Sequence, residues 1–372
     1  MGKGKRMRFH IIIQIFLSIL FVFVTNTFAS QNLNISNVIV NNALIDTRKG
    51  ESAQISFYLH QDTHISLSIK DMDGQNIASI QKNCYKGTNT IFWDGIDDAG
   101  HPVADEAYYF ILKATGLNGL VTLYDPASCS KMEKINIVPQ INADKIAYTL
   151  TKDAYVRIRI GIHNGPLLKT LLDCEPRKAG NYSETWDTKD ESRIIDLNQT
   201  DYIVNIQAYT LPENSIITTG IGMSLLDYKI SSTNKSSLPG QHYNLSLIDR
   251  KRIFSGQSNY SILSLRTMNR APRFDIHVKA NPIRSKQTVS GLIPITIDLE
   301  EMTGLILSNQ RYEIIAYVDY EFLMEDEQGY HPYTFNLDTR NLTNGDHILT
   351  FNVATLTDQV GSGSIKINVQ NN

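Results

Sequence analysis

Cysteine is scarce in this 372-residue sequence, which has three cysteines and only two tryptophans. No Cys-x-x-Cys pair and no Cys/His spacing typical of a metal site occurs, so the cysteines predict no metal centre. An odd number leaves at least one thiol outside any disulfide within the chain. Cys84 and Cys174 occupy matching places in an internal repeat, which favours two buried small apolar residues. A Cys84–Cys129 disulfide is the alternative.

Catalytic motifs are missing as well. The sequence has no Gly-x-Ser-x-Gly, no His-Glu-x-x-His and no P-loop. His60 and His64 lie four residues apart, but a predicted turn separates them, so they do not share a helical face as a zinc-binding pair would. The sequence therefore predicts a protein that is not an enzyme, with no catalytic, cofactor-binding or metal-ligating residue and no cofactor.

A long apolar run occurs once, near the N-terminus. Four basic residues (Lys3, Lys5, Arg6 and Arg8) precede the 14 apolar-rich residues 11–24, and Thr27 and Ala29 provide small residues for cleavage. This pattern predicts a signal peptide over residues 1–29, since a membrane-spanning helix needs roughly 20 apolar residues. No transmembrane segment is expected after cleavage. The protein is expected to be exported to the periplasm, the cell surface or the medium.

An excess of positive charge is also absent. The formal net charge is −3, and removal of the four basic residues of the signal peptide makes it −7 (−3 − 4). An acidic chain offers no electrostatic footprint for nucleic acid, so no nucleic-acid partner is expected.

What the sequence does contain is a repeat. Trp186 follows Trp93 by 93 residues (186 − 93), and both are followed by Asp. Short segments around each Trp alternate apolar and polar residues with period two, as half-buried strands do. Matching segments in the same order are 54–59 with 145–150, 64–69 with 154–160, 77–81 with 168–172, 92–94 with 185–187, and 108–114 with 201–206. Strands at this spacing, without helical periodicity, predict an all-β fold of Ig-like or fibronectin-like sandwiches.

The motif of the first repeat resembles the Ig-like domain of the flagellar hook-capping (FlgD-type) family, which is widespread in secreted bacterial proteins. The residues that carry the resemblance are Trp93, Asp94, Gly95, Asp97, Gly100 and Tyr108. The second repeat retains Trp186, Asp187 and Tyr202 but has Thr188 in place of Gly95 and no clear match for Gly100. A structural role is expected for the motif: a buried indole, Asp side chains that accept from loop amides, and glycines with positive φ.

The last part of the chain resembles bacterial Ig-like domains over its final 40 residues or so. The residues that carry this resemblance are Asp338, Gly345 and His347, in a Pro-Tyr-x-Phe and Gly-x-His context. His347 is expected to be structural. The chain then divides into a signal peptide (1–29), repeat one (36–125), repeat two (134–230), a linker or irregular segment (231–273) and a third sandwich (274–370).

Two Asp-rich turns, residues 71–74 and 94–98, raise the question of calcium. Ca²⁺ needs six to eight oxygen ligands, and neither turn has the ligand order of a calcium loop. Capping of the turns by Asp is the favoured interpretation. Calcium is the weaker alternative.

These observations favour an exported, non-enzymatic spacer or binding module in a bacterial cell-envelope or extracellular assembly. Its expected partners are other envelope or surface proteins, possibly with glycan. The alternative is a carbohydrate- or peptidoglycan-binding accessory protein of an exported hydrolase. A scaffold like the hook cap itself is disfavoured, because the rod-binding region of that family is missing.

Overall fold

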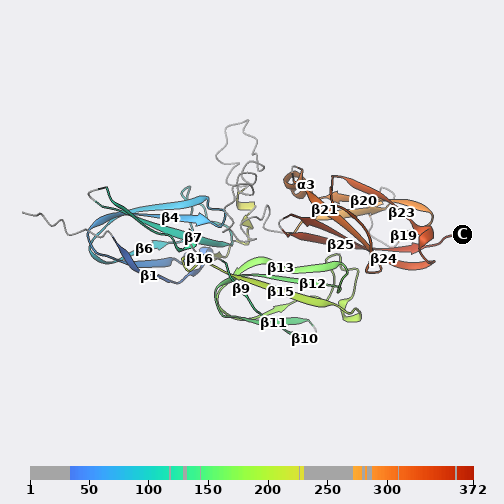
Figure 1. The fold of residues 1–372 in the computed structure, drawn as a ribbon, viewed down its shortest axis with the longest axis horizontal. Helices are drawn as coiled ribbons and strands as arrows, with labels where there is room; N and C mark the ends of the chain where they lie inside the picture. The colour runs from blue at the N-terminus through green and yellow to red at the C-terminus, as the bar shows by residue number, and fades with distance from the viewer. Residues whose placement is uncertain are drawn as a thin grey trace, which may run out of the picture.

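The structure is a computed structural model that describes residues 34–116, 119–128, 132–142, 144–225, 227–229, 271–278, 281–282, 287–308, 310–356 and 358–372. The predicted signal peptide and residues 231–270 of the predicted linker lie outside this part of the chain. The described chain forms three β-sandwiches, and its fold class is all-β as predicted (Figure 1). None of the described helices is long and apolar enough to cross a membrane.

The first sandwich pairs a three-stranded sheet with a larger one. The small sheet has the order β1 (Ile35–Asn41), β3 (Ala53–Leu59), β6 (Gly87–Trp93). The larger has the order β2 (Leu44–Asp46), β16 (Ser215–Thr219), β7 (Ala107–Thr115), β4 (Thr63–Asp71), β5 (Asn76–Cys84), and β8 (Val121–Tyr124) also pairs with β7.

Period-two patterning explains these strands. Along β3 every second residue is buried, so Ile55, Phe57 and Leu59 enter the core while Ser56 and Tyr58 lie between them on the other face. Each such side chain contributes about 1.5–3 kcal/mol by burial. The pattern therefore fixes both the strand and the face that it turns to the core.

The second sandwich is smaller. One sheet has the order β10 (Gln140–Asn142), β11 (Lys145–Leu150), β14 (Gly180–Thr185). The other has the order β13 (Leu167–Arg177), β12 (Ala154–Gly161), β15 (Ile203–Thr210), β9 (Lys134–Ile135).

Strand β16 belongs to the first sandwich, although the second repeat was predicted to extend to residue 230. After β15 the chain returns to the first sandwich, where β16 runs antiparallel to β7 and parallel to β2. The second sandwich is therefore inserted into the large sheet of the first. Its entry and exit lie side by side, since Lys134 is opposite Tyr209.

The third sandwich, predicted over residues 274–370, consists of two sheets. One sheet has the order β18 (Asn281–Pro282), β17 (Phe274–Val278), β20 (Leu292–Leu299), β23 (Tyr333–Asp338). The other has the order β19 (Gln287–Val289), β25 (Val360–Val369), β24 (Gly345–Thr355), β21 (Tyr312–Val318), β22 (Glu321–Asp326). A helix that was not predicted, α3 (Glu301–Leu307), spans seven residues. About two turns are too few to show a helical period in sequence.

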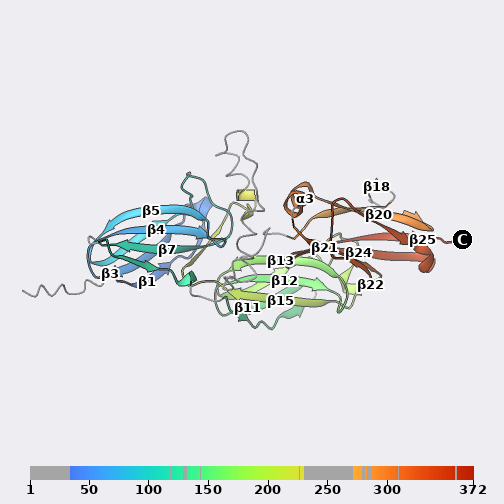
Figure 2. The ribbon, with the colours of Figure 1, turned by 45° about the horizontal axis from the view of Figure 1, so that its top comes forward.

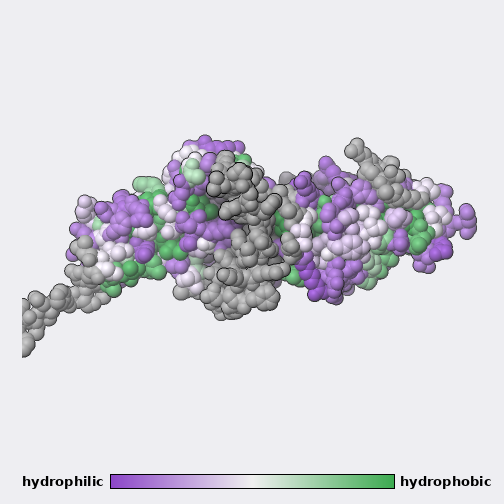
Figure 3. All heavy atoms as spheres, turned by 90° about the horizontal axis from the view of Figure 1, so that it is seen from above, coloured by the Kyte–Doolittle hydropathy of each residue, from purple (hydrophilic) through white to green (hydrophobic). Residues whose placement is uncertain are grey.

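The first and third sandwiches lie at opposite ends of the molecule, and the second lies between them and contacts both (Figures 1 and 2). Seen from above, polar residues cover most of the visible face of the end sandwiches, with smaller apolar areas between them (Figure 3). Within the described ranges, four short 3-10 helices connect strands: η1 (Thr47–Lys49), η2 (Pro126–Ser128), η3 (Leu197–Gln199) and η5 (Thr339–Asn341).

Candidate functional site: the paired Trp-Asp loops

The first loop begins at Trp93, the last residue of β6. Its indole is buried and packs edge-on against Tyr108, with ring centroids 5.5 Å apart and 71° between planes. Its Nε1–H donates to the carbonyl of Ile96 at 2.9 Å. A buried indole usually finds a partner for its one N–H, and here that bond ties the loop to the ring in the core.

Asp97 organises the rest of this loop. One carboxylate oxygen accepts from the backbone N–H groups of Ala99 and His101 at 2.9 and 2.8 Å, and the other accepts from the Tyr228 hydroxyl at 2.7 Å. Burial raises the pKa of Asp97, but the hydrogen bonds, led by that from His101, outweigh burial and hold the pKa below its ordinary value. Asp97 therefore caps the turn and binds a distant tyrosine at the same time.

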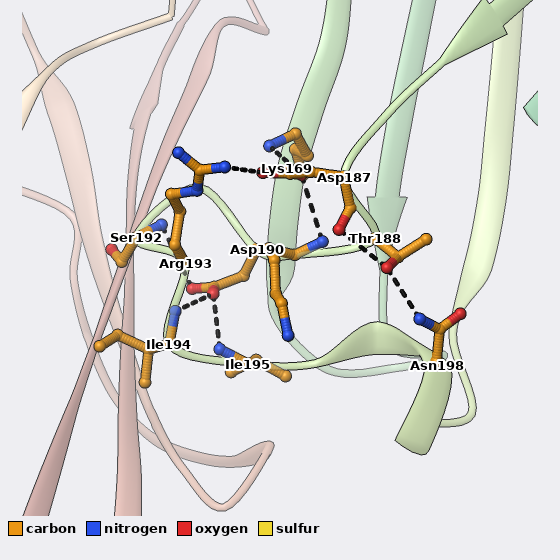
Figure 4. Close-up of polar contacts among 10 residues, drawn as sticks. Lys169, Asp187, Thr188, Asp190, Ser192, Arg193, Ile194, Ile195 and Asn198 are labelled. Atoms are coloured by element: carbon orange, nitrogen blue, oxygen red, sulfur yellow. Dashed lines mark hydrogen bonds and ion pairs between the residues drawn. The ribbon is translucent and has the colours of Figure 1, made fainter. Parts of the chain in front are cut away.

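The second loop, after Trp186, repeats this geometry (Figure 4). Asp190 accepts from the backbone N–H groups of Ser192, Ile194 and Ile195 at 3.4, 2.6 and 2.7 Å. It lies 93 residues after Asp97 (190 − 97), the same interval as between the tryptophans. Equivalent carboxylates therefore cap equivalent turns in the two repeats.

Positive φ angles also recur at the same places. Gly95 (φ 76°) corresponds to Thr188 (φ 52°), and Gly100 (φ 82°) corresponds to Arg193 (φ 60°). The sequence does not reveal Arg193 as the counterpart of Gly100, because arginine is not a residue type that predicts a positive φ. A non-glycine residue there costs roughly 1–2 kcal/mol, which the hydrogen bonds to Asp190 offset.

The two tryptophans differ in one respect. Trp186 is buried and packs edge-on against Tyr202, at 5.7 Å and 79°, much as Trp93 packs on Tyr108. Its Nε1, however, has no hydrogen-bond partner among the described residues. The second loop thus keeps the ring packing and lacks the bond that ties the first loop to its indole.

The described part of the chain consists of three β-sandwiches, the second inserted into the first. It matches no protein-family model and no curated protein. Solved structures align with it as follows. Fibronectin(III)-like modules of Clostridium thermocellum CbhA cover 90% of this chain and 94% of theirs, at 11% identity and a TM-score of 0.20. A tetra-tandem repeat in the extending region of a large adhesion protein covers 91% of this chain and 74% of its own, at 10% identity and a TM-score of 0.19. The FN1–FN3 domains of chicken CNTN1 cover 90% and 98%, at 10% identity and a TM-score of 0.17. At these values the fold class rests on the strand order itself.

The first loop and the neighbouring Asp71 turn hold the segment that follows β16. The Lys229 ammonium lies 2.9 Å from Asp71 and 2.6 Å from Asp73, next to the Tyr228–Asp97 bond. Burial raises the pKa of Asp71, and Lys229 counteracts that effect. The backbone N–H groups of Asp73 and Gln75 also donate to Asp71. Both turns considered for calcium therefore direct carboxylate oxygens to donors of the protein itself.

The second loop touches the third sandwich. The Ser192 hydroxyl accepts from the backbone N–H of Ser364 on β25 at 2.8 Å. Beside it, the Asn352 amide exchanges two hydrogen bonds with the backbone of Leu167, both at 2.9 Å, and the Ser362 hydroxyl donates to the Leu167 carbonyl at 2.6 Å. Each Trp-Asp loop thus lies at a place where separate parts of the chain are joined.

Arg157 and Arg159 on β12 complete this contact with the third sandwich. Arg157 lies 3.1 Å from Asp173 and 2.6 Å from Asp358, and Arg159 lies 3.0 Å from Asp358. No sequence motif marks these two arginines. They lie two residues apart on an otherwise apolar strand and therefore on the same face of the sheet, which could have indicated a polar contact.

The contact between the first and second sandwiches is apolar. Its buried cluster consists of Ala107, Tyr155, Cys174, Leu211 and Ile217. At its edge the Tyr155 hydroxyl donates to the buried Glu106 carboxylate at 2.8 Å. The junction therefore has the character of a small core.

The motif residues of the third sandwich shape turns. Asp338 caps η5 by accepting from the N–H of Arg340, and Gly345 has a φ of 133°. His347 is buried between the Asp319 carboxylate (2.6 Å) and the Thr343 carbonyl (2.8 Å). Burial lowers its pKa, but these two acceptors outweigh burial and raise the pKa above its ordinary value.

Cys84 and Cys174 are buried in separate clusters, and burial raises the pKa of the Cys84 thiol. Cys129 lies outside the described residues. Across the described ranges, no group of three or more His, Cys, Asp or Glu residues has the arrangement of a metal site.

Proposed function

We propose that the chain is an exported, non-enzymatic protein whose three sandwiches serve as a spacer or binding module in a bacterial cell-envelope or extracellular assembly. The observation that carries the proposal is the use made of the Trp-Asp loops. Their carboxylates and hydroxyls bind other parts of the same chain, as in Asp97–Tyr228 and Ser192–Ser364. The Ser192–Ser364 bond holds the second sandwich against the third, and the outer loops and edge strands of the sandwiches are then available to partners.

The hook-capping-type assignment of residues 36–230 belongs to this proposal. It is supported by the matching hydrogen bonds of Asp97 and Asp190 and by the two edge-on Trp–Tyr pairs. Export is proposed from the basic and apolar pattern of residues 1–29.

The test is affinity recovery of partners from envelope extracts with the mature chain (residues 30–372) as bait. We expect an envelope or surface protein to be recovered in stoichiometric amounts. A spacer predicts lower recovery with Asp358→Asn, which loosens the second sandwich from the third, while a single-module binder predicts unchanged recovery. No partner, together with turnover on a panel of envelope substrates, would contradict the proposal.

Glycan binding receives no specific support. Among the residues that the structure describes, the most exposed aromatic side chains are Tyr85 and Phe92 in the first sandwich and Phe322 and Tyr330 in the third, and they lie on different elements. Retention of the chain by insoluble glycans in a sedimentation assay would reverse this ranking.

A further inference from the structure

We propose that the chain transmits pulling force between its ends through the first and third sandwiches, with the second sandwich outside the force path. This inference rests on the proposed spacer function, in which partners bound at the two ends of the chain would pull on it. Two features support the proposal. Each outer sandwich has one pair of parallel strands, formed by an early strand and its last strand. In the second sandwich the first and last strands are antiparallel neighbours.

In the first sandwich the parallel pair is β2 with β16, in the register Leu44–Ile217 to Asp46–Thr219. The Ile217 N–H donates to the Ala43 carbonyl at 2.8 Å, and the Thr219 hydroxyl donates to the Ile45 carbonyl at 3.2 Å. Force that enters ahead of β1 and leaves after β16 loads the antiparallel pair of β1 and β3, and it pulls the parallel strands β2 and β16 in opposite directions along their axes. All hydrogen bonds between the two strands are then loaded together.

The third sandwich repeats this arrangement. β19 runs parallel to β25, in the register Gln287–Ile367 to Val289–Val369, and the Gln370 N–H donates to the Val289 carbonyl at 2.9 Å. β17 and β18 precede β19, and β25 is the last strand of this sandwich. Tension that acts on β19 and on the end of β25 therefore also shears this pair.

The second sandwich has the opposite geometry. Its first and last strands, β9 and β15, are antiparallel, and the backbone and hydroxyl of Thr210 bond to Glu133 where the chain enters. Force on these two ends would break the hydrogen bonds one after another. Because β8 before the insertion and β16 after it both pair with β7, the first sandwich holds these ends together. As long as β16 stays paired, no load passes through the backbone of the second sandwich.

The test is single-molecule force spectroscopy on the mature chain held at its two ends. Unfolding of residues 134–210, which are 77 residues (210 − 134 + 1), releases about 260 Å at 3.3–3.6 Å per residue. We expect this release only after the first sandwich opens. Release before that step would overturn the proposal.

Two variants sharpen the test. Leu44→Cys with Ile217→Cys places opposed thiols on β2 and β16. After oxidation we expect the 260 Å release to be lost, and reduction to restore it. Persistence of the release after oxidation would contradict the proposed force path.

Leu168→Ala removes a fully buried side chain from the second sandwich. It should lower the melting temperature of that sandwich while the force that opens the first stays unchanged. A lower opening force would place the second sandwich in the path. Either failure would leave partner recovery from extracts unaffected, so the two proposals are tested separately.

Discussion

The first sandwich joins the second through the two chain crossings of an insertion and a buried apolar cluster, whereas the second joins the third through ion pairs and side-chain amides. Ile217 and Tyr155 are 2% and 1% exposed, while the Asp358 side chain at the other junction is 50% exposed. Added salt screens partly exposed ion pairs, whereas apolar burial involves no charges to screen. The junction between the first and second sandwiches should therefore stay closed at high salt, whereas the junction between the second and third should open.

The largest expected effect comes from the apolar junction. Ile217→Ala leaves a cavity between the first and second sandwiches and should lower the free energy of unfolding by about 2–5 kcal/mol. Urea denaturation measures it. Ile203→Ala is the matched control, because Ile203 is 46% exposed on β15, and a surface change costs within about 0.5 kcal/mol. Equal effects of the two variants would mean that the junction is not a core.

The polar edge of the same junction gives the next effect. Tyr155→Phe removes the donor to the buried Glu106 carboxylate and should cost about 1–3 kcal/mol. The matched control is Tyr148→Phe, whose partner Glu184 is more accessible to water. A larger loss for Tyr148→Phe in the same urea assay would contradict the account.

A substitution at the polar junction should change the free energy of unfolding less than one at the apolar junction, and it should change the shape of the molecule more. Asp358→Asn should cost about 1–2 kcal/mol, less than a fully buried pair, because half of the Asp358 side chain meets solvent. Small-angle X-ray scattering should show a larger radius of gyration, and added salt should do the same to the unaltered chain. Asp187→Asn, which alters ion pairs within the second sandwich only, should leave the radius unchanged. An unchanged radius for Asp358→Asn would mean that the junction does not depend on this pair.

The smallest effect concerns pH within the third sandwich. The pKa of folded His347 lies above its ordinary value, so its contribution is fully present below that ordinary value and is lost as the pH rises through the folded pKa. The titratable groups that face it are Asp319 and Asp346. His347→Gln should remove this dependence from the melting temperature. A slope that survives the substitution must come from another group.

Local pattern predicted the strands well and the junctions poorly. The alternation of apolar and polar residues over 53–59 predicted β3, because the period of a half-buried strand depends only on its own side chains. β16 is different, because the choice between the two sheets depends on how Ile217 fits beside Tyr155, far away in sequence. Arg193 and Asp358 likewise carry no local sign of a left-handed turn or of a distant arginine.

Amide hydrogen exchange resolved to single residues compares the two junctions most directly. The Ile217 side chain lies in the apolar junction, and its amide, bonded to Ala43 within the large sheet of the first sandwich, should be protected as strongly as the core amide of Phe110. The Leu167 amide, bonded to Asn352 across the polar junction, should open at markedly lower free energy. Equal protection of Ile217 and Leu167, or rapid exchange at Ile217, would contradict the claim that the chain has one fused junction and one separable junction.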